Sequence, residues 1–549
     1  MHAPTRPRSR FVVIVCAAAA MSWLSVATGR ALADPTYWQD IRPILRKNCT
    51  VCHSTKNLKD VDVSGGLALD SYAAIRKGTK HAVIEPGKSE ASILVQRVTT
   101  EDGDQRMPLG ANPLNPAAIA LLRQWINTGA KEGQNPEDRP AVVAAATSKR
   151  TRKLDVTLPT TAVPPKGLVA SSNSAKLELA LKVGPLAPVT AVAFSPDGKL
   201  LATGSYRQVT IWDLATVQPV HTLTHVLGAV NDVRFSPDGQ MLAVAGGQPS
   251  AKGDLRLYSL ADGKLRATLS GHDDVIFSVA FHPDGKRLAS ASFDKTVRIW
   301  NLTSHKAERI LTGHSDFVYA VAFSPDGKWL VSASKDRSVK LVETDTGTSR
   351  LTFSGMDQDV LAVAVSPDGK NVVSSGFDTG IYWWNAQTGQ RIRLQNGHAI
   401  AVHELCFSKD GKRLVSAGAD KTIRVWDGAT GASVRTIAAG SIAYATAIRP
   451  DGKLIASGTF DGLVRLWDAA TGRQLLTLLS IPAEDDRSEW LALTPEGYMA
   501  SSAGLASSVQ WRVAGKGIRA EPVSKTLDQP ESVVKAARGE ALPAPSFGN

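Results

Sequence analysis

Residues 190–198 read Thr-Ala-Val-Ala-Phe-Ser-Pro-Asp-Gly, a short apolar run followed by a turn sequence. Versions of this turn recur, with the acidic residue at positions 197, 238, 284, 326, 368, 410, 451 and 496. Successive positions are 41, 46, 42, 42, 42, 41 and 45 residues apart. Proline and glycine permit a tight turn between two strands, and a period of about 42 residues is typical of four-stranded propeller blades. The repeats therefore predict an all-β propeller.

The number of turns favours eight blades. The stretch from Lys176 to Val513 covers 338 residues, which is about 42 for each of eight units. Leu177, Leu179 and Leu181 alternate in a predicted strand before the first turn, and we expect this strand to complete the final blade and close the ring. Seven blades with an appendage is the alternative, because the last unit is degenerate.

Paired residues inside the repeats make the array resemble WD-repeat propellers. The matching pairs are Gly271-His272, Gly313-His314, Gly397-His398, Trp212-Asp213, Trp426-Asp427 and Trp467-Asp468. The resemblance implies a structural, non-catalytic hydrogen-bond network within a blade, here His272, Ser290, Asp294 and Trp300, and again His398, Ser416, Asp420 and Trp426. Three blades depart from the pattern: blade four has Val342 for tryptophan, blade five has Met356 for histidine, and blade seven lacks the histidine.

The N-terminus has the pattern of an export signal. Arg6, Arg8 and Arg10 precede an apolar run at 11–26, and Ala31-Leu32-Ala33 is a small-residue cleavage site. We expect cleavage after residue 33 and a periplasmic or otherwise exported protein without a membrane span; an uncleaved anchor is the alternative. Removing four arginines changes the net charge from +12 to 12 − 4 = +8. An exported protein has no ready access to DNA, so we expect no nucleic-acid partner.

Two of the four cysteines indicate a cofactor. They lie in Cys49-Thr50-Val51-Cys52-His53, the attachment sequence of c-type haem, in which two thiols bond the porphyrin and the histidine binds iron. A zinc site would need a second Cys/His pair, a thioredoxin-type pair would need a βαβ context, and a disulfide would not need His53. We expect one covalent haem. Cys406 stands alone in the repeats, where alanine occupies the equivalent positions, and is interpreted as a core residue.

Met107 is the expected second axial ligand. It follows Arg106 and shares a segment with the haem motif, and a thioether suits iron that histidine holds on the opposite face. His81 is the rival ligand, and a core role for Met107 is the other alternative. A predicted helix follows, with Pro116 at its first position and Gly129 at its end.

These elements resemble the cytochrome c-like domains of planctomycete-type bacterial proteins. The resemblance covers roughly 100 residues, from Trp38 to Ala130, and includes Arg106-Met107-Pro108, although Leu109 stands where the family often has a second proline. It implies haem carried by Cys49 and Cys52, with His53 and Met107 as axial ligands.

The sequence thus predicts a multidomain chain with a small all-α cytochrome c-like domain and an all-β propeller. The expected parts are a signal peptide at 1–33, a haem domain at 34–133, a linker at 134–174, the propeller at 175–513 and a disordered tail at 514–549. We expect electron transfer with a protein partner docked by the propeller rather than catalysis. A haem enzyme or sensor with a labile distal ligand, and a scaffold with structural haem, are the alternatives.

Overall fold

The computed structural model describes residues 34–42, 44–45, 69, 71–77, 82–100, 114, 116–133, 155–164, 176–224, 226–249, 252–482, 488–518 and 521–547. The chain forms two compact units, residues 1–140 and residues 141–549.

Helices make up the regular structure of the described part of the first unit. They are the π-helix η1 (Tyr37–Ile41) and the α-helices α3 (Tyr72–Lys77), α4 (Ile93–Thr99) and α5 (Pro116–Asn127). The predicted helix is confirmed: α5 begins at the proline, and Gly129 follows it with φ 96°. Leu122 and Trp125 of α5 are buried in one core, because residues spaced at helical intervals share a face.

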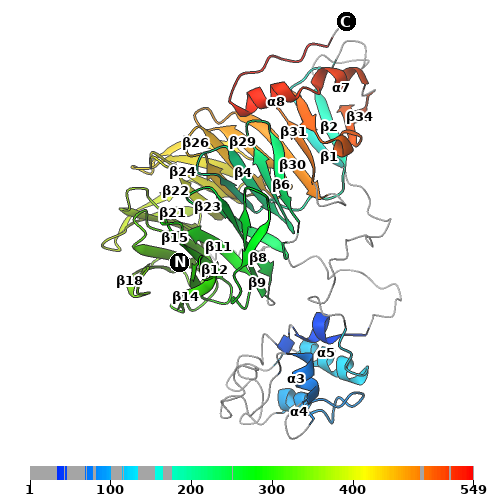
Figure 1. Ribbon diagram of the computed structural model, residues 1–549, viewed down its shortest axis with the longest axis vertical. Helices are drawn as coiled ribbons and strands as arrows, with labels where there is room; N and C mark the ends of the chain where they lie inside the picture. Colours follow the sequence, from blue (N-terminus) through cyan, green and yellow to red (C-terminus); the bar gives the residue numbers. More distant parts are fainter. Residues whose placement is uncertain are drawn as a thin grey trace, which may run out of the picture. The chain divides into compact units, whose positions relative to one another are not determined.

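The described residues of the second unit form eight β-sheets. Six of them are four-stranded blades, and a six-stranded sheet contributes its first four strands as the seventh blade. Figure 1 labels strands from these sheets. Blades one to four are β3 (Ala191–Phe194), β4 (Leu200–Ser205), β5 (Gln208–Asp213), β6 (Gln218–Leu223); β7 (Ala229–Phe235), β8 (Met241–Gln248), β9 (Lys252–Ser259), β10 (Leu265–Thr268); β11 (Ile276–Phe281), β12 (Arg287–Ser292), β13 (Val297–Asn301), β14 (Lys306–Leu311); β15 (Val318–Phe323), β16 (Trp329–Ser334), β17 (Val339–Glu343), β18 (Ser349–Phe353). Blades five to seven are β19 (Val360–Val365), β20 (Asn371–Gly376), β21 (Gly380–Asn385), β22 (Arg391–Asn396); β23 (Val402–Phe407), β24 (Arg413–Gly418), β25 (Thr422–Asp427), β26 (Ser433–Ala438); β27 (Ala443–Ile448), β28 (Leu454–Thr459), β29 (Val464–Asp468), β30 (Gln474–Pro482).

The inner strands of these seven blades contact one another in a closed cycle. Each inner strand packs against the next, and β27 of blade seven packs directly against β3 of blade one. At this seam the amide of Val189 donates to the carbonyl of Thr459 over 3.1 Å. No place is left in the cycle for an eighth inner strand among the described residues. This closed cycle of seven inner strands fits the alternative of seven blades with an appendage.

The eighth sheet is the appendage, and it joins the two ends of the propeller sequence. It has the order β1 (Asp155–Pro159), β2 (Leu177–Lys182), β33 (Val509–Val513) and β34 (Lys516–Gly517). The strand at 177–182 pairs with the last strand of the final repeat unit, as expected, and Leu179 lies opposite Trp511. This sheet nevertheless lies outside the cycle of inner strands. Beyond β30 the sheet of blade seven continues into β31 (Ser488–Leu493) and β32 (Met499–Ser501), followed by the short helix α6 (Ala503–Ala506).

Two expected boundaries need correction. The strand β1 lies within the stretch expected to be a linker, and its backbone pairs with β2. The tail expected to be disordered contains α7 (Glu521–Leu527) and α8 (Pro530–Ala537), and α8 packs against β30 and β32 (Figure 1). Val523, Leu527 and Val533 bury their side chains in the core that blades one and seven share with the appended sheet, and this apolar burial orders the segment.

The recurring turns form because serine and aspartate satisfy the backbone locally. In blade one the hydroxyl of Ser195 donates to Asp197 over 2.6 Å and accepts from the amide of Leu200 over 2.9 Å. The hydrogen bond from Ser195 lowers the pKa of Asp197. Gly198 has φ 72°, a conformation that favours glycine.

The buried tail gives a stability prediction. Leu527→Ala removes a fully buried side chain from the shared core, and we expect it to lower the free energy of unfolding by about 2–4 kcal/mol. Lys525→Ala, at an exposed position of the same helix, is the matched control. Thermal and denaturant unfolding followed by circular dichroism measures both; equal stability of the two variants would show that the tail adds nothing.

Candidate functional site

The four predicted haem-site residues lie outside the described residues. These are Cys49, Cys52, His53 and Met107, and the rival ligand His81 is also outside. The structure does describe what precedes and follows them in the chain, namely η1 before the cysteine motif and α5 after Met107.

The segments on both sides of the haem motif share one hydrophobic core. Tyr37 of η1 and Trp125 of α5 have ring centroids 6.3 Å apart, and Leu45, shortly before the motif, is buried in the same cluster. The indole of Trp125 donates to the carbonyl of Lys131 over 2.9 Å. Trp125 is therefore a core residue, and its packing brings the two ends of the ligand-bearing segment together.

The polar networks that the WD resemblance implied are confirmed. In blade three, Nδ1 of His272 is 2.7 Å from Asp294, Nε2 is 2.7 Å from the Ser290 hydroxyl, and the indole of Trp300 donates to the same hydroxyl over 2.7 Å. Blade six repeats this arrangement, with His398 2.7 Å from Ser416 and 3.0 Å from Asp420, and with the Trp426 indole donating to Ser416.

The electrostatics of these networks favour a structural role. Burial lowers the pKa of His272 and of His398, so each imidazole is held neutral between its two partners. Burial alone would raise the pKa of Asp294, but hydrogen bonds led by that from His272 outweigh it and lower this pKa to about 2. Ser290 and Ser416 are fully buried, so a substrate cannot reach either hydroxyl, and each hydroxyl also accepts a hydrogen bond from a tryptophan indole.

Blades four, five and seven lack the tryptophan or the histidine of this network, and each differs in what takes its place. In blade four, His314 still binds Asp336 and Ser332, although Val342 stands at the tryptophan position. In blade five, Met356 is buried, and the Ser374 hydroxyl lies 3.4 Å from its sulfur. Blade seven uses Arg465, which pairs with Asp461 over 2.7 Å.

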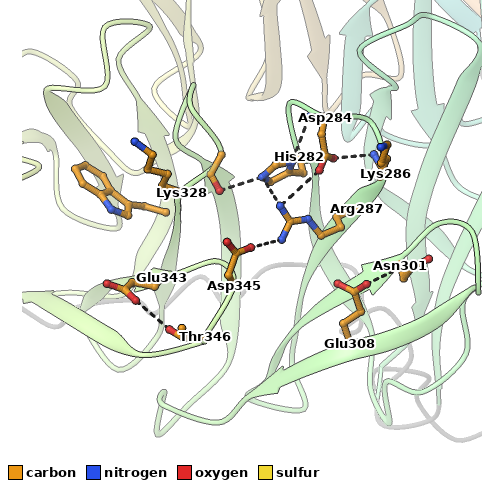
Figure 2. Close-up of polar contacts among 12 residues, drawn as sticks. His282, Asp284, Lys286, Arg287, Asn301, Glu308, Lys328, Glu343, Asp345 and Thr346 are labelled. Atoms are coloured by element: carbon orange, nitrogen blue, oxygen red, sulfur yellow. Dashed lines mark hydrogen bonds and ion pairs between the residues drawn. The ribbon is translucent and has the colours of Figure 1, made fainter.

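A histidine at one turn links blades three and four, as Figure 2 shows. His282 occupies the turn position that serine holds in most repeats, and its Nε2 lies 3.0 Å from the carbonyl of Gly327 in the next blade. Its Nδ1 lies 2.8 Å from Asp284, and Arg287 donates to Asp345 of blade four over 2.6 Å. Because the imidazole is buried between protein groups, we interpret these contacts as a structural link that stabilises the packing of blade three against blade four.

Three charged side chains meet across the central channel. Arg234 on β7 pairs with Asp232 of the same strand over 3.1 Å and with Glu404 on β23 over 3.0 Å. Blades two and six are not neighbours, so this contact passes through the centre of the ring. Each carboxylate also accepts a hydrogen bond from the following blade, Asp232 from the amide of Val279 and Glu404 from that of Thr446.

Burial makes this channel cluster costly to disturb. It raises the pKa of Glu404 to about 7, against the opposing effect of Arg234, and raises the pKa of Asp232 in the same way. Two carboxylates share a single guanidinium, so Arg234 is the group that makes both negative charges tolerable. The other blades have mostly alanine at these positions, for example Ala320 and Ala322 in blade four.

Aromatic side chains gather where the inner strands begin, at the ring face opposite the Pro-Asp-Gly turns, here called the upper face. Phe293 stacks on both Phe277 and Phe317 with centroids 4.3 Å apart, and Tyr319 meets Phe277 edge-on at 5.4 Å. The Lys335 ammonium lies 4.7 Å from the centre of the Phe317 ring. These five residues form the upper-face aromatic patch.

Further aromatic side chains on the upper face are exposed. Tyr206, Phe377 and Phe460 directly follow the second strand of their blades, as Phe293 does, and are 57%, 38% and 46% exposed. Phe460 lies 6.4 Å from Tyr444, which is 5.1 Å from His403. Exposed aromatic groups on a rigid surface are typical of protein-binding faces.

Sequence reasoning missed the channel cluster and the aromatic patch. One signal was available, because Asp232, Arg234 and Glu404 interrupt repeat positions that otherwise hold small residues. Cys406, expected in the core, is only partly buried and packs beside one of the hydrophobic clusters. In the described part of the chain, no helix is long and apolar enough to cross a bilayer, and no group of three His, Cys, Asp or Glu could hold a metal ion.

Comparisons with known proteins identify both parts of the chain. The family model "WD domain, G-beta repeat" matches seven stretches between residues 180 and 468, and "Planctomycete cytochrome C" matches residues 49–108. An uncharacterised WD repeat-containing protein of Synechocystis is 31% identical over 111 residues, 20% of this chain and 30% of that protein. The U3 small nucleolar RNA-associated protein 12 of Saccharomyces cerevisiae is 32% identical over 110 residues, 20% of this chain and 11% of its own length. The matches thus span less than a third of either relative.

The channel cluster predicts non-additive mutational effects. Arg234→Ala leaves two carboxylates without their shared cation, and we expect it to destabilise the propeller by about 3 kcal/mol. The triple variant Asp232→Ala, Arg234→Ala, Glu404→Ala restores the small residues common to the other blades and should recover most of that loss. Denaturant unfolding of both variants provides the measurement. A triple variant less stable than Arg234→Ala would contradict this account.

Proposed function

Because the chain belongs to the WD-repeat proteins across residues 180–468 and carries a cytochrome c-like domain at residues 49–108, we propose that it is an exported c-type cytochrome. It holds one covalent haem and exchanges electrons with a protein partner that the propeller binds. The observation that carries the proposal is the Cys49–His53 haem-attachment sequence within the matched cytochrome segment.

Four residues would hold the haem. Cys49 and Cys52 would form the two thioether bonds, while His53 and Met107 would bind the iron. The donor set fits haem c, since it offers two thiols, an imidazole and a thioether. The shared core of Tyr37 and Trp125 supports the same fit, because it draws together the chain on both sides of these residues. When bound, the haem supplies reversible one-electron oxidation and reduction.

The ligand set favours a carrier over a catalyst. His53 and Met107 together would hold the iron with two protein ligands, which would leave no coordination site for a substrate, and such a pair would raise the reduction potential. The polar networks of the propeller are engaged in holding strands and supply no competing catalytic centre among the described residues.

Two arguments support export of the protein: the predicted signal peptide and the proposed covalent attachment of haem. The apolar run at 11–26 and the small-residue site at 31–33 support secretion. The periplasm, or an equivalent exported compartment, is where we place the mature protein, since bacterial haem attachment of this kind occurs outside the cytoplasm.

The upper face of the propeller is the proposed docking surface for the redox partner. Its aromatic patch and the exposed Tyr206, Phe377 and Phe460 provide large, rigid contact groups. Such groups carry much of the binding energy at protein interfaces because they bury apolar area with little loss of conformational freedom.

A visible spectrum of the exported full-length protein tests the haem proposal. We expect c-type haem bands and an intact mass that includes one porphyrin. Cys49→Ala with Cys52→Ala should abolish covalent attachment, and Met107→Ala should change the axial-ligand spectrum and allow rapid carbon monoxide binding. Met241→Ala, on β8, is the control and should leave the spectrum unaltered. Colourless wild-type protein with two free thiols would refute the haem proposal. An unchanged spectrum in the Met107→Ala variant would show that Met107 is not an iron ligand.

A second prediction concerns the docking surface. Phe377→Ser with Phe460→Ser removes exposed aromatic groups, and we expect the second-order rate of haem reduction by a native cell-envelope fraction to fall roughly tenfold, which corresponds to about 1.4 kcal/mol. The control is Ile392→Ser with Val434→Ser, because these two residues lie on outer strands and, as a pair, are at least as exposed as the two phenylalanines. Stopped-flow absorbance measures the rates. If both pairs reduce the rate to the same extent, the upper face is not the specific docking surface.

A further inference from the structure

Blades three, four and six each place an imidazole in the wedge between one blade and the next. The side chains of His272, His314 and His398 are almost fully buried there. The preceding blade also borders the wedge of blade three. Gly253 of β9 packs so closely on His272 that a Cβ atom added to this glycine would lie 2.8 Å from the Cβ of His272. The imidazole therefore fills space that two neighbouring blades enclose.

Blade one lacks this filling group. Pro185 follows Gly184 where His272 follows Gly271, and Pro185 is exposed. The turn between β4 and β5 contains Arg207 and no aspartate, so the second partner of the network is missing as well. In this wedge, between blades seven and one, lies a cavity of about 320 Å³, here called the seam pocket.

The lining of the seam pocket is neutral and mainly apolar. None of the lining residues, all of which the structure describes, is Asp, Glu, Lys, Arg or His. The apolar walls come from both blades and from the loop between β2 and β3. They include Val183, Leu186, Val189, Val464, Leu478 and Ile481. Its exposed members are Pro185, Ala187, Tyr206 and Pro482.

Three polar side chains converge in this lining. The amide nitrogen of Gln208 donates to the hydroxyl of Thr210 over 3.0 Å and to that of Ser480 over 2.7 Å, and the two hydroxyls lie 2.8 Å apart. Gln208 is buried, and Ser480 comes from blade seven, so the trio crosses the seam. Hydroxyl groups can donate or accept, which lets the trio exchange a hydrogen bond with a neutral ligand.

We propose that the seam pocket binds an uncharged small molecule with an apolar body and a single hydroxyl or carbonyl group. The volume falls in the range of small-molecule sites, which combine apolar walls with a few convergent polar groups. A charged ligand would lose its hydration without meeting an opposite charge. The occupant would contact blades one and seven together, so its binding energy would add to the stability of the closed ring.

A matched probe series on the full-length protein tests the chemical class. Benzyl alcohol, toluene, benzoate and benzylamine share one apolar ring and differ in the attached group. We expect saturable binding of benzyl alcohol with a Kd on the order of 1 mM, weaker binding of toluene, and no saturable binding of the two ions. Ligand-observed NMR measures affinity, and benzyl alcohol should raise Tm. Preference for an ion, or no saturable binding of any probe, would overturn the proposal.

Two variants locate the binding. Ala187→Trp places a bulky ring at an exposed lining position, and we expect loss of benzyl alcohol binding, whereas Ala261→Trp, in an exposed turn of blade two, should bind normally. Ser480→Ala should remove the preference for benzyl alcohol over toluene, while Ser488→Ala on the neighbouring strand should retain it. Each variant is checked for an unaltered circular dichroism spectrum. Benzyl alcohol binding that survives Ala187→Trp, together with an unchanged preference over toluene in Ser480→Ala, would place the site elsewhere. The haem spectrum is independent of these readouts.

Discussion

The propeller depends on the need of each four-stranded sheet to cover both of its faces. Apolar side chains such as Trp300 and Val321 are buried only because a neighbouring blade lies against them, so the array is stable when the ring closes. Six of the seven junctions join blades that follow each other in the chain. The junction of β27 with β3 joins sequence-distant blades, and there the appended sheet brings β2 and β33 together while α8 packs on β30 and β32.

Closure of the ring explains why so many polar residues have structural roles. A buried hydroxyl, imidazole or carboxylate is tolerated when its hydrogen bonds are satisfied, and the networks around Ser290 and Ser416 satisfy theirs within one blade. The channel cluster applies the same requirement across the ring, where Arg234 balances two carboxylates. The upper face is different, because its aromatic groups exceed what the ring itself can bury, and this excess is what makes it a docking surface in the proposed function.

The first unit follows a related logic on a smaller scale. A short helical segment cannot bury much apolar surface, so its core around Tyr37, Leu45 and Trp125 must be completed by long-range contacts between η1 and α5. In the proposed function, covalent haem would add a further large apolar group to this unit. The chemistry would then reside in the small unit and recognition in the propeller, a separation that lets each be altered without the other.

The sequence by itself determined the features that depend on neighbouring residues. The turn at Ser195–Gly198, helix α5, and the blade networks of His272 and His398 each follow from hydrogen bonds or side-chain spacing within a few dozen residues, and the haem prediction rests on one pentapeptide. Only the tertiary structure decided that seven inner strands form a closed cycle, that β2 and β33 lie in a sheet outside this cycle, that Leu527 is buried, and that Arg234 reaches Glu404. Those outcomes depend on contacts between residues far apart in the chain, and their energies arise from packing geometry that no local pattern encodes.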